Sequence, residues 1–285
     1  MGFSFSFLSS TPKHIITKEN VFSTFKLEPK RICFTTCHKN ALKKTGWETG
    51  PSYALWLPFC NTIKHMFDSY TGLCINQLKN GKYWCALKDD KEKELAQGFI
   101  DNHNRTVFLR DELEISCAIS EYCYFEDGIQ HCTKIGELEK VAKNDGDEEA
   151  IKQLSDVVTG FIKSATYYSK ADCICGVPSS KNLPAKIASL IASQAGKLTD
   201  ISSSISFLNE KDEVKNKKDI KERWSILEAA DLQVGEDDVK GKKIILLDDM
   251  YQTGITMQFI AMKLLEAGAS NVYGLSLVKA ASNNL

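Results

Sequence analysis

Residues 243–256 read KIILLDDMYQTGIT and combine a strand, an acidic pair and a turn. The apolar run from Ile244 to Leu247 predicts a buried strand over Lys242–Leu247, since strands covered on both faces are continuously apolar. Asp248 and Asp249 follow at its carboxyl end, where open α/β sheets bind ligands. Neighbouring side chains of an extended chain point to opposite faces, so we expect a loop to begin at this pair.

The second part of the block, Thr253-Gly254-Ile255-Thr256, predicts a tight turn at the start of a helix over Thr256–Ala267. Unpaired backbone N–H groups and the helix dipole favour a phosphate at such a position. Carboxylates accept hydrogen bonds from vicinal hydroxyls, as a ribose offers. The alternative is an ordinary strand end with Thr256 as helix N-cap. The agreement of the whole block favours a ribose 5-phosphate site.

The surrounding sequence has the alternation of helices and apolar strands that is typical of α/β proteins. A strand over Asn271–Val278 completes a strand, helix, strand unit, which implies a parallel pair. Further elements are predicted as a strand over 171–178 and helices over 134–143, 148–168 and 183–195. We therefore expect an α/β fold with a central parallel sheet and flanking helices.

The block at 244–256 resembles the 5-phosphoribosyl-1-pyrophosphate (PRPP) motif of type I phosphoribosyltransferases, and the chain resembles their ComF-like branch. The likeness covers about 134–285 and includes Thr133–Leu138, Cys175–Ser180 and Glu222-Arg223. It implies that Asp248 and Asp249 contact the ribose. The turn that would hold the 5-phosphate comprises Met250, Tyr251, Gln252, Thr253, Gly254, Ile255 and Thr256.

The resemblance also implies a reaction in which pyrophosphate leaves C1 of PRPP with Mg²⁺ bound to the substrate. The expected pyrophosphate loop is Pro178, Ser179, Ser180 and Lys181, in which backbone N–H groups and Lys181 suit an anion. Arg223 is the other candidate catalytic residue and would contact the pyrophosphate, within a charged segment over 210–223 that would cover the site. For Lys181 and Arg223 the alternative is a solvated surface residue. We assign no protein ligand to a metal.

Residues 1–133 form the less regular part of the sequence, with aromatic-rich strand fragments between polar turns such as Asn80-Gly81. We expect an α+β accessory region here, acting as a hood that selects the acceptor, followed by a phosphoribosyltransferase-type domain over 134–285. This region lacks the paired Cys-x-x-Cys motifs of ComF-like proteins, and Cys33-x3-Cys37-His38 is the nearest match. Four ligands are needed for a closed site, so we do not expect zinc.

The composition excludes several other classes of protein. Thirty-six Lys and Arg balance 37 Asp and Glu, so the total charge predicts no attraction to nucleic acid or membranes. The longest apolar run, Tyr53–Cys60, is far short of the roughly 20 residues that span a bilayer. Ten cysteines without an export signal indicate reduced thiols in the cytoplasm.

Two functions follow from the sequence. The first is a Mg²⁺-dependent phosphoribosyltransferase that binds PRPP and an unidentified acceptor. The second is a catalytically silent module that senses PRPP or a nucleotide as a regulator or effector, in DNA uptake or phage defence. An intact acidic pair favours ligand binding without deciding catalysis. A homodimer, and a protein or nucleic-acid partner for the N-terminal region, are left open.

Overall fold

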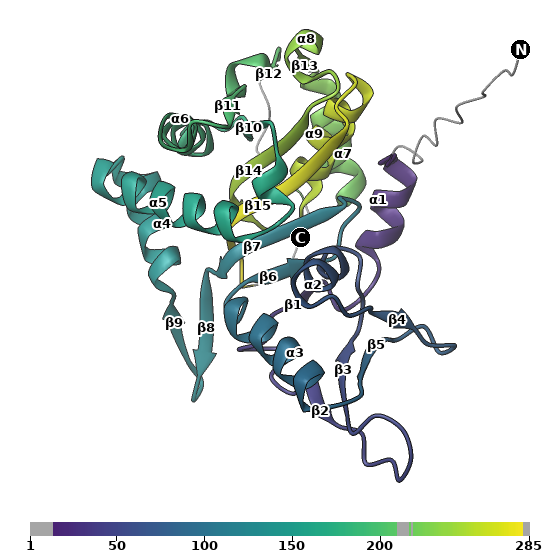
Figure 1. The fold of residues 1–285 in the computed structure, drawn as a ribbon. Coiled ribbons are helices and arrows are strands. Elements are labelled where there is room, and N and C mark those ends of the chain that lie inside the picture. Colours follow the sequence, from purple (N-terminus) through teal and green to yellow (C-terminus); the bar gives the residue numbers. More distant parts are fainter. Residues whose placement is uncertain (1–13, 210–216, 218, 282–285) are drawn as a thin grey trace, which may run out of the picture.

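The computed structural model describes residues 14–209, 217 and 219–281. Its centre is a seven-stranded sheet in the order β1-β6-β7-β15-β14-β10-β11 (Figure 1). The five strands from β7 to β11 run parallel, and β6 and β1 add an antiparallel edge. In sheet order the strands are β1 (Arg31–Ile32), β6 (Val107–Leu109), β7 (Ile115–Glu121), β15 (Asn271–Lys279), β14 (Lys243–Tyr251), β10 (Cys173–Gly176) and β11 (Thr199–Asp200).

Helices cover both faces of this sheet, which confirms the predicted α/β class with a central, mainly parallel sheet. Alternate side chains of β14 enter two separate cores, because successive residues of a strand face opposite ways. Ile245 and Leu247 pack towards α4, α5 and α6, whereas Ile244 and Leu246 pack towards α1, α7 and α9. The helices are α1 (Lys18–Phe25), α4 (Lys134–Asp145), α5 (Glu148–Ser164), α6 (Leu183–Ala195), α7 (Ile220–Ala229) and α9 (Ile255–Glu266).

The central strand is longer than predicted, and the expected loop at Asp248 is wrong. Strand β14 continues through both aspartates to Tyr251, because β15 is equally long and keeps pairing with it. Asp248 pairs with Ser276, and Tyr251 pairs with Lys279 at the end of the ladder. The turn therefore begins only after Tyr251, three residues beyond the start of the acidic pair.

The N-terminal region contributes both to the central sheet and to a separate layer. Strands β1, β6 and β7 of the central sheet all precede residue 133, so this sheet contains strands from both sides of the predicted domain boundary. A four-stranded antiparallel sheet, in the order β2-β3-β5-β4, lies with two helices at the lower right of Figure 1. These elements are β2 (Leu42–Lys44), β3 (Tyr53–Leu57), β4 (Asn76–Gln77), β5 (Tyr83–Leu87), α2 (Ile63–Thr71) and α3 (Asp90–Asn102).

Two short antiparallel pairs complete the fold. The hairpin of β8 (Cys123–Glu126) and β9 (Ile129–Cys132) links β7 to α4, and β12 (Ile205–Phe207) pairs with β13 (Leu232–Val234) ahead of α8 (Glu236–Val239). Among the described residues, no helix is both long enough and apolar enough to cross a membrane.

Candidate functional site

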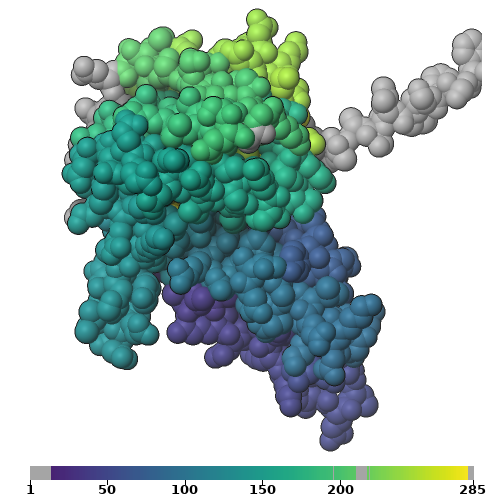
Figure 2. Space-filling model, turned by 60° about the vertical axis from the view of Figure 1, so that its left-hand side comes forward, coloured from purple at the N-terminus to yellow at the C-terminus, as the bar shows by residue number. Residues whose placement is uncertain are grey.

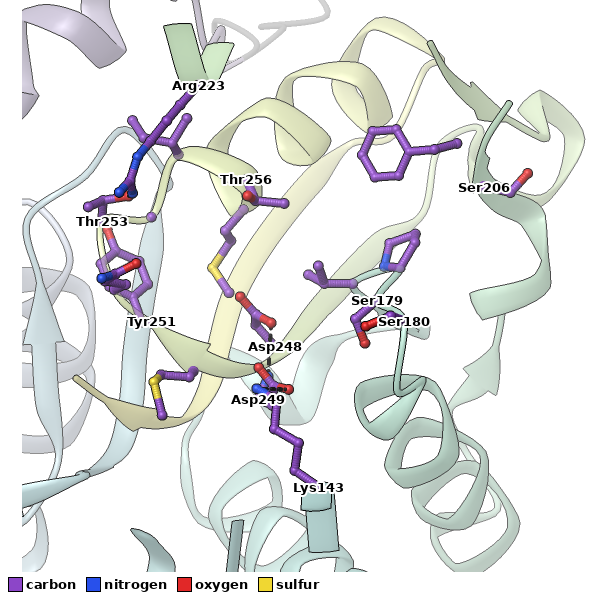
Figure 3. Close-up of a pocket in the computed structure, with 18 of the residues that line it drawn as sticks. Lys143, Ser179, Ser180, Ser206, Arg223, Asp248, Asp249, Tyr251, Thr253 and Thr256 are labelled. Atoms are coloured by element: carbon purple, nitrogen blue, oxygen red, sulfur yellow. Dashed lines mark hydrogen bonds and ion pairs between the residues drawn. The ribbon is translucent and has the colours of Figure 1, made fainter. Parts of the chain in front are cut away.

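A cavity of about 710 Å³ lies at the carboxyl ends of β10 and β14. This volume falls within the range of small-molecule sites. Figure 3 shows the acidic pair between the turn before α9 on one side and the turn after β10 on the other. The walls are formed by Lys143, Val177–Ser180, Ser206, Phe207, Asn209, Arg223 and residues 248–257. The structure thus brings together most of the residues that the sequence predicted for the site.

The two aspartates reach the cavity from opposite faces of β14. The Asp249 backbone N–H donates to Asp248 Oδ1 at 2.9 Å, which fixes the orientation of the first carboxylate. Asp249 is 7% exposed, and its Oδ2 lies 2.7 Å from Lys143 Nζ (Figure 3). Because the site lies at the end of the strand, both side chains line one cavity although they leave the backbone in opposite directions.

Lys143 is a site residue that the sequence did not single out. It lies in the last turn of α4, with Glu139 Oε1 at 3.4 Å and one turn earlier on the same helix. Burial raises the pKa of Glu139. Burial opposes the charge of Lys143, but the carboxylates of Asp249 and Glu139 outweigh it, and its pKa is raised. The Lys143 side chain therefore keeps its positive charge at the wall of the cavity, beside Asp249.

The turn before α9 has the geometry of an anion site. Gly254 has φ 74° and precedes the first helical residue, Ile255, so the backbone N–H groups of the first turn of α9 are unpaired within the helix. Glycine is suited to this left-handed conformation because it lacks a Cβ atom. Thr253, Gly254 and Thr256 all line the cavity. A tight turn is thus formed at Gly254, and the helix begins one residue ahead of its predicted start.

The Tyr251 side chain packs against this turn. It is 5% exposed, and its hydroxyl donates to Asp111 Oδ2 at 2.9 Å. The second Asp111 oxygen accepts from the Leu113 backbone N–H at 3.1 Å. The Tyr251 ring lies so close to Gly254 that a Cβ atom on Gly254 would be 2.1 Å from the tyrosine oxygen. Asp111 could not be predicted as the partner of Tyr251 from the sequence, because the two residues are 140 positions apart.

Arg223 lies beside the turn before α9. It is 2% exposed and belongs to α7, where its Nε donates to the Lys217 carbonyl at 2.7 Å. Its Nη1 donates to Thr253 Oγ1 at 3.2 Å. Figure 3 places Arg223 on the side of Thr253, across the cavity from Ser179 and Ser180. Most of the predicted cover, residues 210–216 and 218, lies outside the described residues.

The turn after β10 supplies the opposite wall. Pro178, Ser179 and Ser180 line the cavity, whereas Lys181 is exposed and is not among its lining residues. Gly176 allows α6 to approach the end of β10 closely, because a Cβ atom there would lie 2.4 Å from the Ala185 nitrogen of α6. Its own N–H donates to Ser202 Oγ at 2.9 Å. Three of the four residues of the predicted pyrophosphate loop therefore line the same cavity as the acidic pair.

No cluster of three or more His, Cys, Asp or Glu side chains in the described part of the chain is arranged to hold a metal ion. The Cys-x3-Cys-His segment forms a local contact instead, in which His38 Nδ1 lies 3.0 Å from Cys37 Sγ. Among the described residues, Asp248 and Asp249 are the two that offer carboxylate oxygens to the cavity. A magnesium ion would accordingly need most of its ligands from a bound phosphorylated substrate and from water.

We expect Asp111 to make the stability of the fold depend on pH below neutrality. Burial raises the pKa of Asp111 from 3.8 to about 6. Between these values Asp111 holds a proton in the folded protein that it has released in the unfolded chain, so its contribution to the free energy of unfolding falls as pH rises from about 4 to 6. The total change is about 3 kcal/mol, from about 1.4 kcal/mol per pKa unit. Denaturant titrations of the wild type and Asp111→Asn across this window will measure it.

The variant Asp111→Asn should lose most of this slope, since asparagine does not titrate and still accepts the Tyr251 hydrogen bond. Asp145→Asn, at an exposed position, is the matched control and should keep the slope of the wild type. Equal slopes in the wild type and Asp111→Asn would show that Asp111 is not the titrating group.

Comparisons with known proteins give similar solved structures at low identity. No protein-family model and no curated protein matches the chain. The allosteric regulatory enzyme of purine biosynthesis is 15% identical, with a TM-score of 0.37, over 79% of this chain and 44% of its own. Glutamine PRPP amidotransferase from B. subtilis, complexed with ADP and GMP, is 14% identical, with a TM-score of 0.37, over 79% and 46%. Adenine phosphoribosyltransferase from Leishmania donovani is 14% identical, with a TM-score of 0.33, over 55% and 61%.

Proposed function

We propose that the chain binds PRPP in the cavity at β14 and transfers its 5-phosphoribosyl group to an acceptor, releasing pyrophosphate. The observation that carries the proposal is the acidic pair held next to a helix N-terminal turn in one cavity. Each element alone is common, but together they match a sugar with hydroxyls and a terminal phosphate. The match of residues 244–256 to the PRPP motif supports the same assignment.

In this proposal Asp248 and Asp249 accept hydrogen bonds from the 2- and 3-hydroxyls of the ribose. The 5-phosphate lies at the start of α9, where backbone N–H groups and the Thr253 and Thr256 hydroxyls donate to it. The Arg223 guanidinium, hydrogen-bonded to Thr253, adds positive charge behind that turn. Its proposed role is therefore support of the 5-phosphate site, although the sequence suggested a pyrophosphate contact.

The pyrophosphate would occupy the side of the cavity formed by Pro178, Ser179 and Ser180. Backbone N–H groups of this turn are suited to an anion. Lys181 is exposed, so its contact with pyrophosphate requires its side chain to turn inwards when the ligand binds. Magnesium, bound with PRPP, would neutralise the charge that develops on the leaving pyrophosphate.

A second candidate function is a sensor that binds PRPP or a nucleotide without turnover. The observation that favours it is the charge of the walls. Among the described lining residues, Lys143 and Arg223 are the cations, and neither belongs to the turn at 178–180. A site with few cations near the leaving group can bind a ligand and still be a poor catalyst. The proposed location, for either function, is the cytoplasm, and the ComF-like branch is the proposed relation.

The experiment that separates these functions is titration of PRPP with Mg²⁺ into the full chain by isothermal calorimetry, followed by a pyrophosphate-release assay with the common bases. Saturable binding and base-dependent release are expected for a transferase. Binding without release under every acceptor would favour the sensor. Absence of binding would overturn both functions.

A further inference from the structure

The hairpin of β8 and β9 places two cysteines opposite each other. Cys123 and Cys132 are direct partners in its antiparallel register. The Thr133 backbone N–H donates to the Tyr122 carbonyl at 3.0 Å, immediately outside this pair. This bond makes Cys123 and Cys132 a non-hydrogen-bonded pair, the class in which opposing Cα atoms are about 4.5 Å apart and side chains lie closest. That separation is within the range that a disulfide bridges, about 4.4–6.8 Å.

The two thiols differ in exposure. Cys132 is exposed, whereas Cys123 is 4% exposed and accepts a hydrogen bond from Gln130 Nε2 at 2.9 Å. Burial and the neighbouring Cys132 thiol raise the pKa of Cys123. Because the thiolate is the nucleophile, the exposed Cys132 is suited to react first with a molecule from solution, and Cys123 is suited to react second.

Both cysteines line a second cavity, separate from the one at β14. Its volume is about 600 Å³. Figure 2 shows the hairpin and the N-terminal part projecting from the same side of the molecule with a recess between them. Within the described part of the chain, four cations and two acidic side chains line the cavity, namely Arg31, Lys39, Arg105 and Lys134 with Glu121 and Glu126. The excess of positive charge favours an anionic ligand.

We propose that Cys123 and Cys132 form a reversible disulfide by exchange with a small, carboxylate-bearing disulfide that enters this cavity. The Cys132 thiolate attacks one sulfur of the small disulfide, which releases one thiolate and leaves a mixed disulfide on Cys132. The Cys123 thiolate then attacks the Cys132 sulfur and releases the second thiol. The two cysteines lose two electrons and two protons, and the small disulfide is reduced to two thiols.

The register singles out this pair among the ten cysteines, all of which lie in described segments. The other cysteines that lie in strands are paired with residues of other types, such as Cys85 with Leu55 and Cys175 with Leu246. Cys37 lines the same cavity and is exposed, which makes it the matched control for accessibility. The proposal is independent of PRPP binding.

The test is incubation of the folded full chain with oxidised glutathione, followed by alkylation of the remaining thiols and peptide mass spectrometry. The wild type should yield a peptide cross-linked through Cys123 and Cys132, which dithiothreitol removes. Cys123→Ser should lose the cross-link and accumulate glutathione on Cys132. Cys132→Ser should also lose it, and Cys37→Ser should retain it. In denaturant the selectivity for this pair should disappear.

Two results would overturn the proposal. One is a wild-type protein in which Cys123 and Cys132 are both still free thiols after incubation with oxidised glutathione, so that both are alkylated in the following step. The other is glutathione retained on Cys132 to the same extent in the wild type and in Cys123→Ser, because the buried thiol would then have failed to displace it. The wild-type measurement alone decides the first result, so a variant that folds poorly does not weaken the test.

Discussion

The double variant Asp248→Asn, Asp249→Asn is expected to bind PRPP at least about 100-fold more weakly than the wild type. A hydrogen bond to a charged group contributes about 1.5–3 kcal/mol, so loss of two contributes about 3–6 kcal/mol. Each 1.4 kcal/mol corresponds to about tenfold in affinity. The replacement also leaves Lys143 without the carboxylate that lies 2.7 Å from its Nζ. Calorimetric titration with PRPP and Mg²⁺ will give both dissociation constants.

The matched control is Glu236→Gln, Asp237→Asn, which removes the same two charges from exposed positions on α8. Neither residue lines the cavity, so this control should bind PRPP as the wild type does. Thermal unfolding of both double variants will show whether the fold is retained. Equal affinity of the two folded double variants would mean that the acidic pair does not contact the ligand.

Short-range patterns in the sequence were sufficient to predict helix α6 and the turn before α9. Helix α6 has the predicted bounds, Leu183–Ala195, because its apolar spacing is regular and Gly196 ends it with φ 61°. The turn before α9 was predicted because glycine and threonine have strong local preferences. The end of β14 was predicted wrongly, since its length is decided by pairing with β15 and not by its own residues.

The site residues that the sequence did not indicate depend on contacts between distant segments. Lys143 is one of many lysines on helix faces that look exposed in the sequence, and only the packing of α4 against β15 and β7 brings it to Asp249 of the neighbouring strand β14. Asp111 lies in the loop between β6 and β7, and it meets Tyr251 because this loop packs near the start of α9, where the Glu112 N–H also donates to Gln258. The pairing of Cys123 with Cys132 depends on the register of a short hairpin. The turn at Asp127-Gly128 is compatible with this register but does not determine it.

The replacement Gly254→Ala is expected to destabilise the fold by about 2–5 kcal/mol and to abolish phosphate binding at the turn. An alanine with positive φ costs about 1–2 kcal/mol. Its Cβ atom would also lie 2.1 Å from the Tyr251 oxygen and 2.3 Å from the neighbouring ring carbon. Overpacking of this kind costs about 1–3 kcal/mol. Tyr251 cannot move away freely, because it is buried and hydrogen-bonded to Asp111.

The control Gly241→Ala separates the two contributions. Gly241 has φ 73°, nearly the 74° of Gly254, but no atom outside its chain neighbours lies within 4 Å of its Cβ position. Gly241→Ala should therefore show only the backbone cost, and denaturant unfolding should place it between the wild type and Gly254→Ala. Tyr251→Ala removes the side chain with which the new Cβ atom clashes. Gly254→Ala should therefore lower the free energy of unfolding by less in a Tyr251→Ala background than in the wild type. If Gly241→Ala and Gly254→Ala are equally destabilised, the Tyr251 ring does not constrain the turn. Partial recovery of stability without recovery of PRPP binding would show that the backbone at Gly254, beyond its packing, positions the N–H groups of α9.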